Sequence, residues 1–100
     1  MSRRYRVTPR AHADLKAIAR YTQANWGAGR RDAYLADLDR RFAWLAENPG
    51  LGSPRPELCA GYRSYPQGAH VIFYIPRETA IDIIGVVHRS MDVEGYFGEG

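Results

Sequence analysis

The pattern of hydrophobic and polar residues separates extended stretches from helical ones. Two runs rich in β-branched and aromatic residues, 71–75 and 81–88, are separated by five residues and predict a β-hairpin. Alternation along the second run makes both of its faces apolar, with Ile81, Ile83 and Val87 expected on one face and Ile84 and Val86 on the other. We therefore expect a central strand, and a hairpin that other elements must cover.

The N-terminal half of the chain predicts two amphipathic helices. Thr8 can accept a hydrogen bond from a free helical N–H and Pro9 suits the first helical position, so the first helix should run from there to about residues 25–29. The second should run from about residue 29 to 47, where Asn-Pro-Gly stops it. Its apolar seam consists of Leu35, Leu38, Phe42 and Leu45. Two such helices with a short turn predict an antiparallel helical hairpin that covers one face of the sheet.

Shorter patterns complete the expected fold. Residues 3–8 and 62–65 predict two further strands, and residues 49–61, rich in proline and glycine, predict an ordered connector. Asp92 can cap a last helical turn. We expect a single α/β (α+β) domain over residues 1–100, with a four-stranded, mainly antiparallel twisted sheet and the helical hairpin packed on one face.

Trp44 does not belong to the seam of the second helix. At about 100° per residue, its side chain lies roughly 130° from the centre of that seam. The indole is therefore expected either to pack at the rim of the core or to form part of a surface for a partner.

Composition limits the protein class. One hundred residues, 45% hydrophobic and 25% charged, suit one modest core. Cys59 is the lone cysteine and cannot close an intrachain disulfide, and no secretory leader opens the chain, so a cytoplasmic location is expected. No apolar window approaches the ~18 residues of a membrane span, so no membrane partner is expected.

The basic charge is one-sided. The chain has 13 arginines and a single lysine, Lys16, and its first fifty residues carry ten basic and five acidic side chains. Arginine suits bidentate contacts to carboxylate or phosphate, so an acidic protein and a nucleic acid are both admissible partners. A plain solvated surface explains the same charge equally well.

Few residues suggest chemistry. His12, His70 and His88 have no second ligand at metal spacing, and no nucleophile elbow or phosphate-binding loop occurs, so neither a metal nor a cofactor is expected. Strand pairing could bring Arg63 close to His88 and Arg89, which would suit phosphate binding or acid–base cleavage of RNA. The alternative is that these arginines are edge residues paired with Glu78, Asp92 or solvent.

Several segments in order resemble one family. The stretches NPGLGSPRPEL after the second helix, YRSYPQGAHVIFYI on the middle strands and VVHRSMDVEGYF near the end are similar to a ParE toxin of the RelE/ParE superfamily. The resemblance covers essentially the whole chain. It implies a bacterial type II toxin–antitoxin module, in which a ParD-like antitoxin wraps the helical hairpin and the sheet.

The resemblance leaves three functions open. ParE-like members act on DNA gyrase, whereas RelE-like members are ribosome-dependent mRNA endonucleases, and a non-toxic remnant that only binds is the third. A nuclease would use Arg63, His88, Arg89 and Tyr96. Because these residues supply only a partial set of the basic side chains of a RelE-like site, a gyrase inhibitor without catalytic residues is the preferred interpretation. No sequence-specific DNA binding by this chain alone is expected.

Two sets of binding residues follow from this interpretation. The antitoxin is expected to contact Tyr21, Tyr34, Arg41, Trp44 and Arg63, a mixture of aromatic and arginine side chains that is typical of interface hot spots. The gyrase is expected to contact Arg89, Met91, Asp92, Tyr96 and Phe97. The C-terminal segment is too short to be stable alone and must dock on something, although Met91, Val93 and Phe97 could simply cap the sheet.

Overall fold

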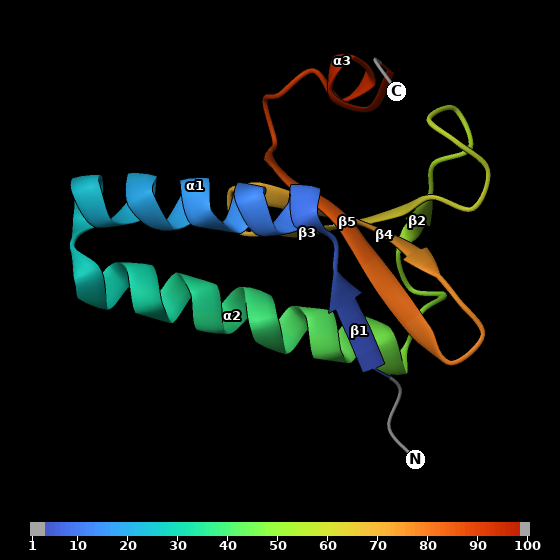
Figure 1. Cartoon of the computed structure of the whole chain (residues 1–100), viewed down its shortest axis with the longest axis horizontal. Coiled ribbons are helices and arrows are strands. Elements are labelled where there is room, and N and C mark those ends of the chain that lie inside the picture. Colours follow the sequence, from blue (N-terminus) through green and yellow to red (C-terminus); the bar gives the residue numbers. More distant parts are fainter. Residues whose placement is uncertain (1–3, 99–100) are drawn as a thin grey trace.

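The computed structural model describes residues 4–98 and shows a helical hairpin against a twisted sheet (Figure 1). In chain order the elements are β1 Arg4–Val7, α1 Pro9–Trp26, α2 Ala28–Glu47, β2 Ser53–Pro54, β3 Arg63–Gln67, β4 His70–Pro76, β5 Ala80–His88 and α3 Val93–Gly98. The strands lie in the order β1-β5-β4-β3-β2, with β1 parallel to β5 and all other pairs antiparallel. The predicted α+β class, the helical hairpin and the mainly antiparallel sheet are confirmed.

The sheet has five strands, so the predicted count of four is wrong. The additional strand is β2, in which Ser53 and Pro54 pair with Ser64 and Arg63 inside the predicted connector. Proline has no N–H to donate, but at the edge of a sheet that donor is not needed. Two residues carry no recognisable alternation, which is why the pattern predicted a loop there.

Local signals at the two ends of α1 set the geometry of the helical hairpin. The Thr8 hydroxyl accepts from the Ala11 N–H at 3.3 Å, and the Thr8 N–H donates to the Ile83 carbonyl at 3.1 Å, so the cap also joins the helix to β5. At the other end Gly27 alone separates the helices, with φ of +92°, a conformation that favours glycine. The predicted start of α2 is thus one residue late.

An irregularity in β5 decides which residues form the core. Phe73 pairs with Gly85 but Tyr74 pairs with Ile83, so Ile84 is an extra residue that β4 does not match. The alternation changes phase there, and Val86 joins Ile81 and Ile83 in the core beneath the helices. The predicted grouping of Val87 with Ile81 and Ile83 is therefore wrong. The core cluster also contains Ala11, Ile18, Leu38, Phe42, Leu45, Ala46, Ile72 and Tyr74.

The loop after α2 is tied to the core by one buried hydroxyl. The Tyr74 hydroxyl donates to the Pro49 carbonyl at 2.8 Å and accepts from the Gly52 N–H at 2.9 Å. A side chain at position 52 would collide with this ring, since a Cβ there would lie 2.3 Å from the Tyr74 oxygen. Arg63 holds the same loop by donating to the Gly52 carbonyl at 2.6 Å.

We predict that Tyr74→Phe lowers the free energy of unfolding by about 1–3 kcal/mol, because the Pro49 carbonyl and the buried Gly52 N–H both lose their partner. Urea denaturation measures the change. Tyr65→Phe is the matched control: Tyr65 lies on neighbouring β3, is half-buried, and has no hydroxyl hydrogen bond among the described residues. Equal effects of the two substitutions would contradict the role given to Tyr74.

Candidate functional site

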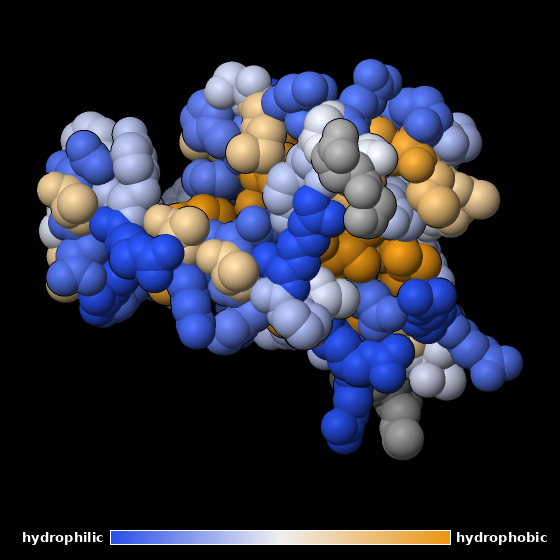
Figure 2. Space-filling model, turned by 45° about the horizontal axis from the view of Figure 1, so that its top comes forward, coloured by the Kyte–Doolittle hydropathy of each residue, from blue (hydrophilic) through white to orange (hydrophobic). Residues whose placement is uncertain are grey.

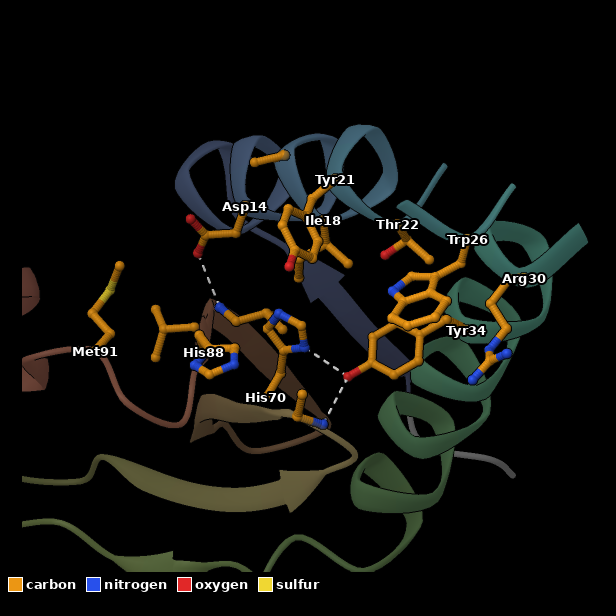
Figure 3. Close-up of a pocket in the computed structure, with 14 residues that line it drawn as sticks. Asp14, Ile18, Tyr21, Thr22, Trp26, Arg30, Tyr34, His70, His88 and Met91 are labelled. Carbon is orange, nitrogen blue, oxygen red and sulfur yellow. Dashed lines mark hydrogen bonds between the residues drawn. The ribbon is translucent and has the colours of Figure 1, made fainter. Parts of the chain in front are cut away.

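A cleft opens where the helical hairpin extends beyond the sheet. Eighteen residues of α1 span roughly 27 Å, whereas β1 has four residues and ends where the helix begins. Between the distal halves of both helices and the adjoining ends of β4 and β5 lies a cleft of about 720 Å³ (Figure 3). Its walls come from α1 and α2, and His70, His88 and Met91 border it on the sheet side.

The cleft gathers most of the large apolar side chains that the described chain leaves exposed. Four such side chains stand out within residues 4–98: Tyr21 (68% exposed), Trp26 (63%), Leu51 (57%) and Met91 (46%). All except Leu51 line the cleft. Arg30 stands beside them, with its guanidinium 5.3 Å from the centre of the Trp26 ring. An exposed apolar group of this kind, next to a cation, is typical of a surface that binds another molecule.

One face of the molecule is mainly hydrophilic. Figure 2 shows the strongly hydrophobic residues of this face in recesses, while a few moderately hydrophobic ones stand out at the surface. Tyrosine and tryptophan are pale on this scale, so the aromatic lining of the cleft is best followed in the close-up (Figure 3).

Tyr34 fixes the end of the cleft where β4 begins. Its hydroxyl donates to the Gln67 carbonyl at 3.1 Å, accepts from the Ala69 N–H at 3.2 Å and lies 2.6 Å from His70 Nδ1. A hydroxyl has a single proton. Because the Tyr34 hydroxyl donates that proton to the Gln67 carbonyl, the hydrogen bond between Tyr34 and His70 must use a proton on His70 Nδ1. Gly68 makes the turn possible, with φ of +59° and no Cβ to strike the Tyr34 ring. The aromatic wall and the turn therefore depend on each other.

Burial shifts the pKa values of two titratable groups in this network, His70 and Tyr34. Burial lowers the pKa of His70, and the neighbouring His88, whose ring centre lies 5.7 Å from that of His70, lowers it further, against a smaller opposing effect of Asp14. Burial also raises the pKa of Tyr34. At neutral pH both side chains are consequently uncharged, which suits an apolar occupant.

Asp14 closes the edge of β5 beyond the end of β1. Its carboxylate Oδ2 accepts from the Val86 N–H at 2.9 Å, shown as a dashed line in Figure 3, and also from the Tyr96 hydroxyl. The first bond satisfies a strand edge that β1 no longer covers. The second reaches α3, so a single oxygen joins α1, β5 and the C-terminal helix.

The C-terminal helix covers the sheet face opposite the helical hairpin. The Phe97 ring packs edge-on against Phe73 at 5.1 Å and Tyr62 at 5.4 Å. Gly85 allows this approach, since a Cβ at that position would lie 3.1 Å from the Tyr96 ring. Arg10 stacks on Tyr96 at 3.9 Å and donates to its carbonyl. Burial raises the pKa of Tyr96, and the hydrogen bond to Asp14 raises it further.

The residues predicted to bind an antitoxin lie along one flank of the molecule. Tyr21 and Tyr34 line the cleft. Further along α2, Arg41 donates to the Gln67 side chain at 2.8 Å and stacks on Trp44, which is half-buried with its ring 5.2 Å from Tyr65. Trp44 therefore packs at the rim of the core. Arg63 lies at the far end of this flank, where it holds the loop after α2.

The four residues considered for a nuclease are not brought together. Arg63 on β3 pairs with Tyr74, whereas His88 on β5 pairs with His70 at the opposite end of β4. The expectation that strand pairing brings Arg63 close to His88 is thus wrong, because β4 separates their strands. Tyr96 is engaged by Asp14, and Arg89 is exposed. Residues 4–98 contain no group of three or more histidine, cysteine, aspartate or glutamate side chains that could hold a metal ion.

The residues predicted to meet the target fall into two classes. Arg89, Met91 and Asp92 are exposed in the segment between β5 and α3. Tyr96 and Phe97 are half-buried against the protein itself, so the sheet-capping alternative accounts for the place of Phe97. The prediction missed Asp14 and the position of Trp26 in the cleft. The pattern carries no signal for Asp14, because its role depends on the irregularity in β5.

Comparison with known proteins identifies the family. A family model described as the ParE toxin of the type II toxin–antitoxin system parDE matches residues 5–93. The chain belongs to the ParE toxin family.

Curated ParE toxins align over nearly their whole length. The chain is 38% identical to toxin ParE1 of Caulobacter vibrioides over 94 residues, which covers 94% of this chain and 97% of that toxin. It is 37% identical to toxin ParE1 of Mycobacterium tuberculosis over 95 residues, with the same coverage. Toxin ParE of Escherichia coli is 35% identical over 91 residues, covering 89% of this chain and 87% of that toxin. This protein is thus a ParE-family toxin of a type II toxin–antitoxin system.

Solved structures of toxin–antitoxin systems share the fold. The chromosomal ParDE system of Pseudomonas aeruginosa matches with a TM-score of 0.74 and 19% identity, covering 87% of this ParE chain and 96% of that chain. The RelBE2 toxin–antitoxin complex of Mycobacterium tuberculosis matches with a TM-score of 0.62 and 23% identity, covering 89% and 100%. At these identities the likeness shows the fold. Among the described residues, none of the helices is long and apolar enough to cross a membrane.

We predict that this ParE toxin loses stability between pH 7 and pH 5 in part through His70. A lowered pKa means that the folded chain binds a proton less readily than the unfolded chain, whose histidine titrates near 6.5. The His70 contribution is therefore present above that pH and is lost as the pH falls through the folded-state value. Denaturation at successive pH values should show a smaller loss in His70→Gln than in the wild type. His12→Gln, at an exposed site on α1, should keep the wild-type dependence, and an unchanged slope in His70→Gln would contradict the prediction.

Proposed function

We propose that this ParE toxin inhibits DNA gyrase and is neutralised by a ParD-like antitoxin, a segment of which occupies the cleft. Family membership supports both parts, and the solved relative from Pseudomonas aeruginosa is a ParDE system. The observation that carries the choice of the cleft is the exposure of Tyr21, Trp26 and Met91 around one hollow. Exposure of these large apolar side chains to water is unfavourable, so a partner that covers them gains binding free energy.

The chemistry of the flank indicates the kind of segment that fits. Large apolar side chains of the antitoxin would enter between Tyr21, Trp26 and Tyr34, which form the walls of the cleft. Arg30 stands beside the cleft and Arg41 lies further along the same helix, so acidic residues on the segment would meet cations at its borders. The excess of basic over acidic side chains in the first fifty residues favours the same partner. An acidic, amphipathic segment suits this surface.

The surface proposed to bind gyrase is the segment after β5. Arg89, Met91 and Asp92 are exposed there, and Met91 also borders the cleft, so the two proposed surfaces adjoin each other at Met91. The separation of Arg63 from His88 removes the assembled basic cluster that RNA cleavage would require, which favours a toxin that binds its target without catalysis. The choice of gyrase itself rests on the ParE family.

For the antitoxin, we predict that Tyr21→Ala and Trp26→Ala each weaken binding about 30-fold or more, as expected for aromatic hot spots, with little loss of stability because both side chains are exposed. Isothermal titration calorimetry with the cognate ParD-like antitoxin measures the affinity. Leu51→Ala is the matched control, since Leu51 is exposed to a similar extent but lies outside the cleft. The affinity of Trp44→Ala tests separately whether the antitoxin also contacts α2 outside the cleft. Wild-type affinity in both cleft variants would remove the cleft from the antitoxin site.

For the target, we predict that Arg89→Ala reduces inhibition of gyrase supercoiling about tenfold and leaves antitoxin affinity within about threefold, because Arg89 is exposed in the proposed target segment and does not line the cleft. The exposed arginine Arg20 on α1 provides the control substitution, Arg20→Ala, which should leave supercoiling inhibition unchanged. Growth assays and primer extension on translated messages complete the test. Toxin-dependent cuts in those messages would replace gyrase by the nuclease alternative.

A further inference from the structure

The C-terminal helix is held by few contacts. α3 has six residues, none of them fully buried, and a helix of that length is unstable without docking. Its anchors are the Phe97 ring on the sheet and the Tyr96 side chain, which Asp14 and Arg10 hold from α1. Such a helix is expected to dock and undock, so a change at one anchor alters how often it is seated.

Asp14 serves this anchor and the cleft at the same time. It lines the cleft, whereas Tyr96 does not. Its Oδ2 accepts from both Val86 and Tyr96, and no partner for its Oδ1 occurs within residues 4–98. The carboxylate is half-buried, so water from the open cleft can solvate it when Tyr96 leaves.

We propose that Asp14 couples the two surfaces: an antitoxin segment in the cleft fixes α3 against the body of the toxin through the Asp14–Tyr96 hydrogen bond. The proposal rests on the antitoxin occupying the cleft. Neutralisation then includes an effect on the C-terminal segment that requires no contact between the antitoxin and α3.

The physical reason is the removal of water. When the cleft is filled, the Asp14 carboxylate can no longer exchange the Tyr96 hydroxyl for solvent, so undocking leaves a buried charge with one hydrogen bond fewer. The bond itself is stronger in the drier environment. Both effects disfavour the undocked state. Because coupling between two binding events is reciprocal, a seated α3 must in turn strengthen antitoxin binding by the same factor.

The first measurement is hydrogen exchange of residues 93–98 in the full-length toxin, free and saturated with its cognate ParD-like antitoxin. We expect exchange in the wild type to slow about fivefold or more on binding. In Tyr96→Phe, which keeps the ring on Arg10 and Phe97 but lacks the hydroxyl, the slowing should be less than about twofold. Equal slowing in both proteins, or none in the wild type, would overturn the coupling.

The second measurement is antitoxin affinity in a double-mutant cycle. Tyr96→Phe should weaken binding about fivefold although Tyr96 does not line the cleft. In an Asp14→Asn background, Tyr96→Phe should change antitoxin affinity no more than about twofold. The neutral amide of Asn costs less to bury than a carboxylate, so loss of the Tyr96 hydroxyl matters less when the cleft is filled. Tyr62→Phe is the matched control, since Tyr62 also contacts Phe97 but its hydroxyl makes no hydrogen bond within the described residues. It should leave affinity unchanged.

These outcomes separate the coupling from the proposed function. If the antitoxin binds and is weakened by Tyr21→Ala and Trp26→Ala, but the cycle shows additive effects of Asp14→Asn and Tyr96→Phe, the cleft stands and the coupling is wrong. If the antitoxin does not bind, or binds without using the cleft, the proposed function fails and the coupling fails with it.

Discussion

The hydrogen bond from the Val86 N–H to the Asp14 carboxylate is the contact at which α1, β5 and the cleft meet. β1 pairs with β5 only as far as Ile83, so the rest of β5 would present an open edge at the base of the cleft. The extra residue Ile84 moves Val86 into the core and directs its N–H toward α1. The Asp14 carboxylate satisfies that N–H and, together with the Thr8 cap, joins α1 to β5.

Elements set by neighbouring residues were predictable from the sequence, and those set by distant residues were not. Thr8 and Pro9 start α1, and Gly27 separates the helices, because caps and positive φ are local properties. The phase change at Ile84 has no such signal. Residues 83–87 are all aliphatic or glycine, so either face of this part of the strand could be buried, and only the fit against β4 and the helices decides.

The same distinction explains the candidate site. Tyr21 and Tyr34 were predicted at a binding surface from residue type and helical position, and both line the cleft. Arg63 and His88 were expected close together because antiparallel pairing of their strands could bring them near each other. Strand order is a property of the whole sheet, and β4 lies between them. Asp14 could not be recognised, since an acidic residue on an amphipathic helix is ordinarily a solvated one.

Size gives a reason for two surfaces to share one residue. A chain of 100 residues buries one core, and the helical hairpin takes one face of the sheet for it. The cleft lies where the helices extend past the sheet, and α3 packs on the remaining face. These two places meet at the uncovered edge of β5, the side on which β1 ends early. A side chain that satisfies that edge necessarily touches both surfaces. In the proposed function, an antitoxin fills the cleft and the segment around α3 meets the target. Asp14 is the side chain that touches both places, since it lines the cleft and accepts the hydrogen bond from Tyr96.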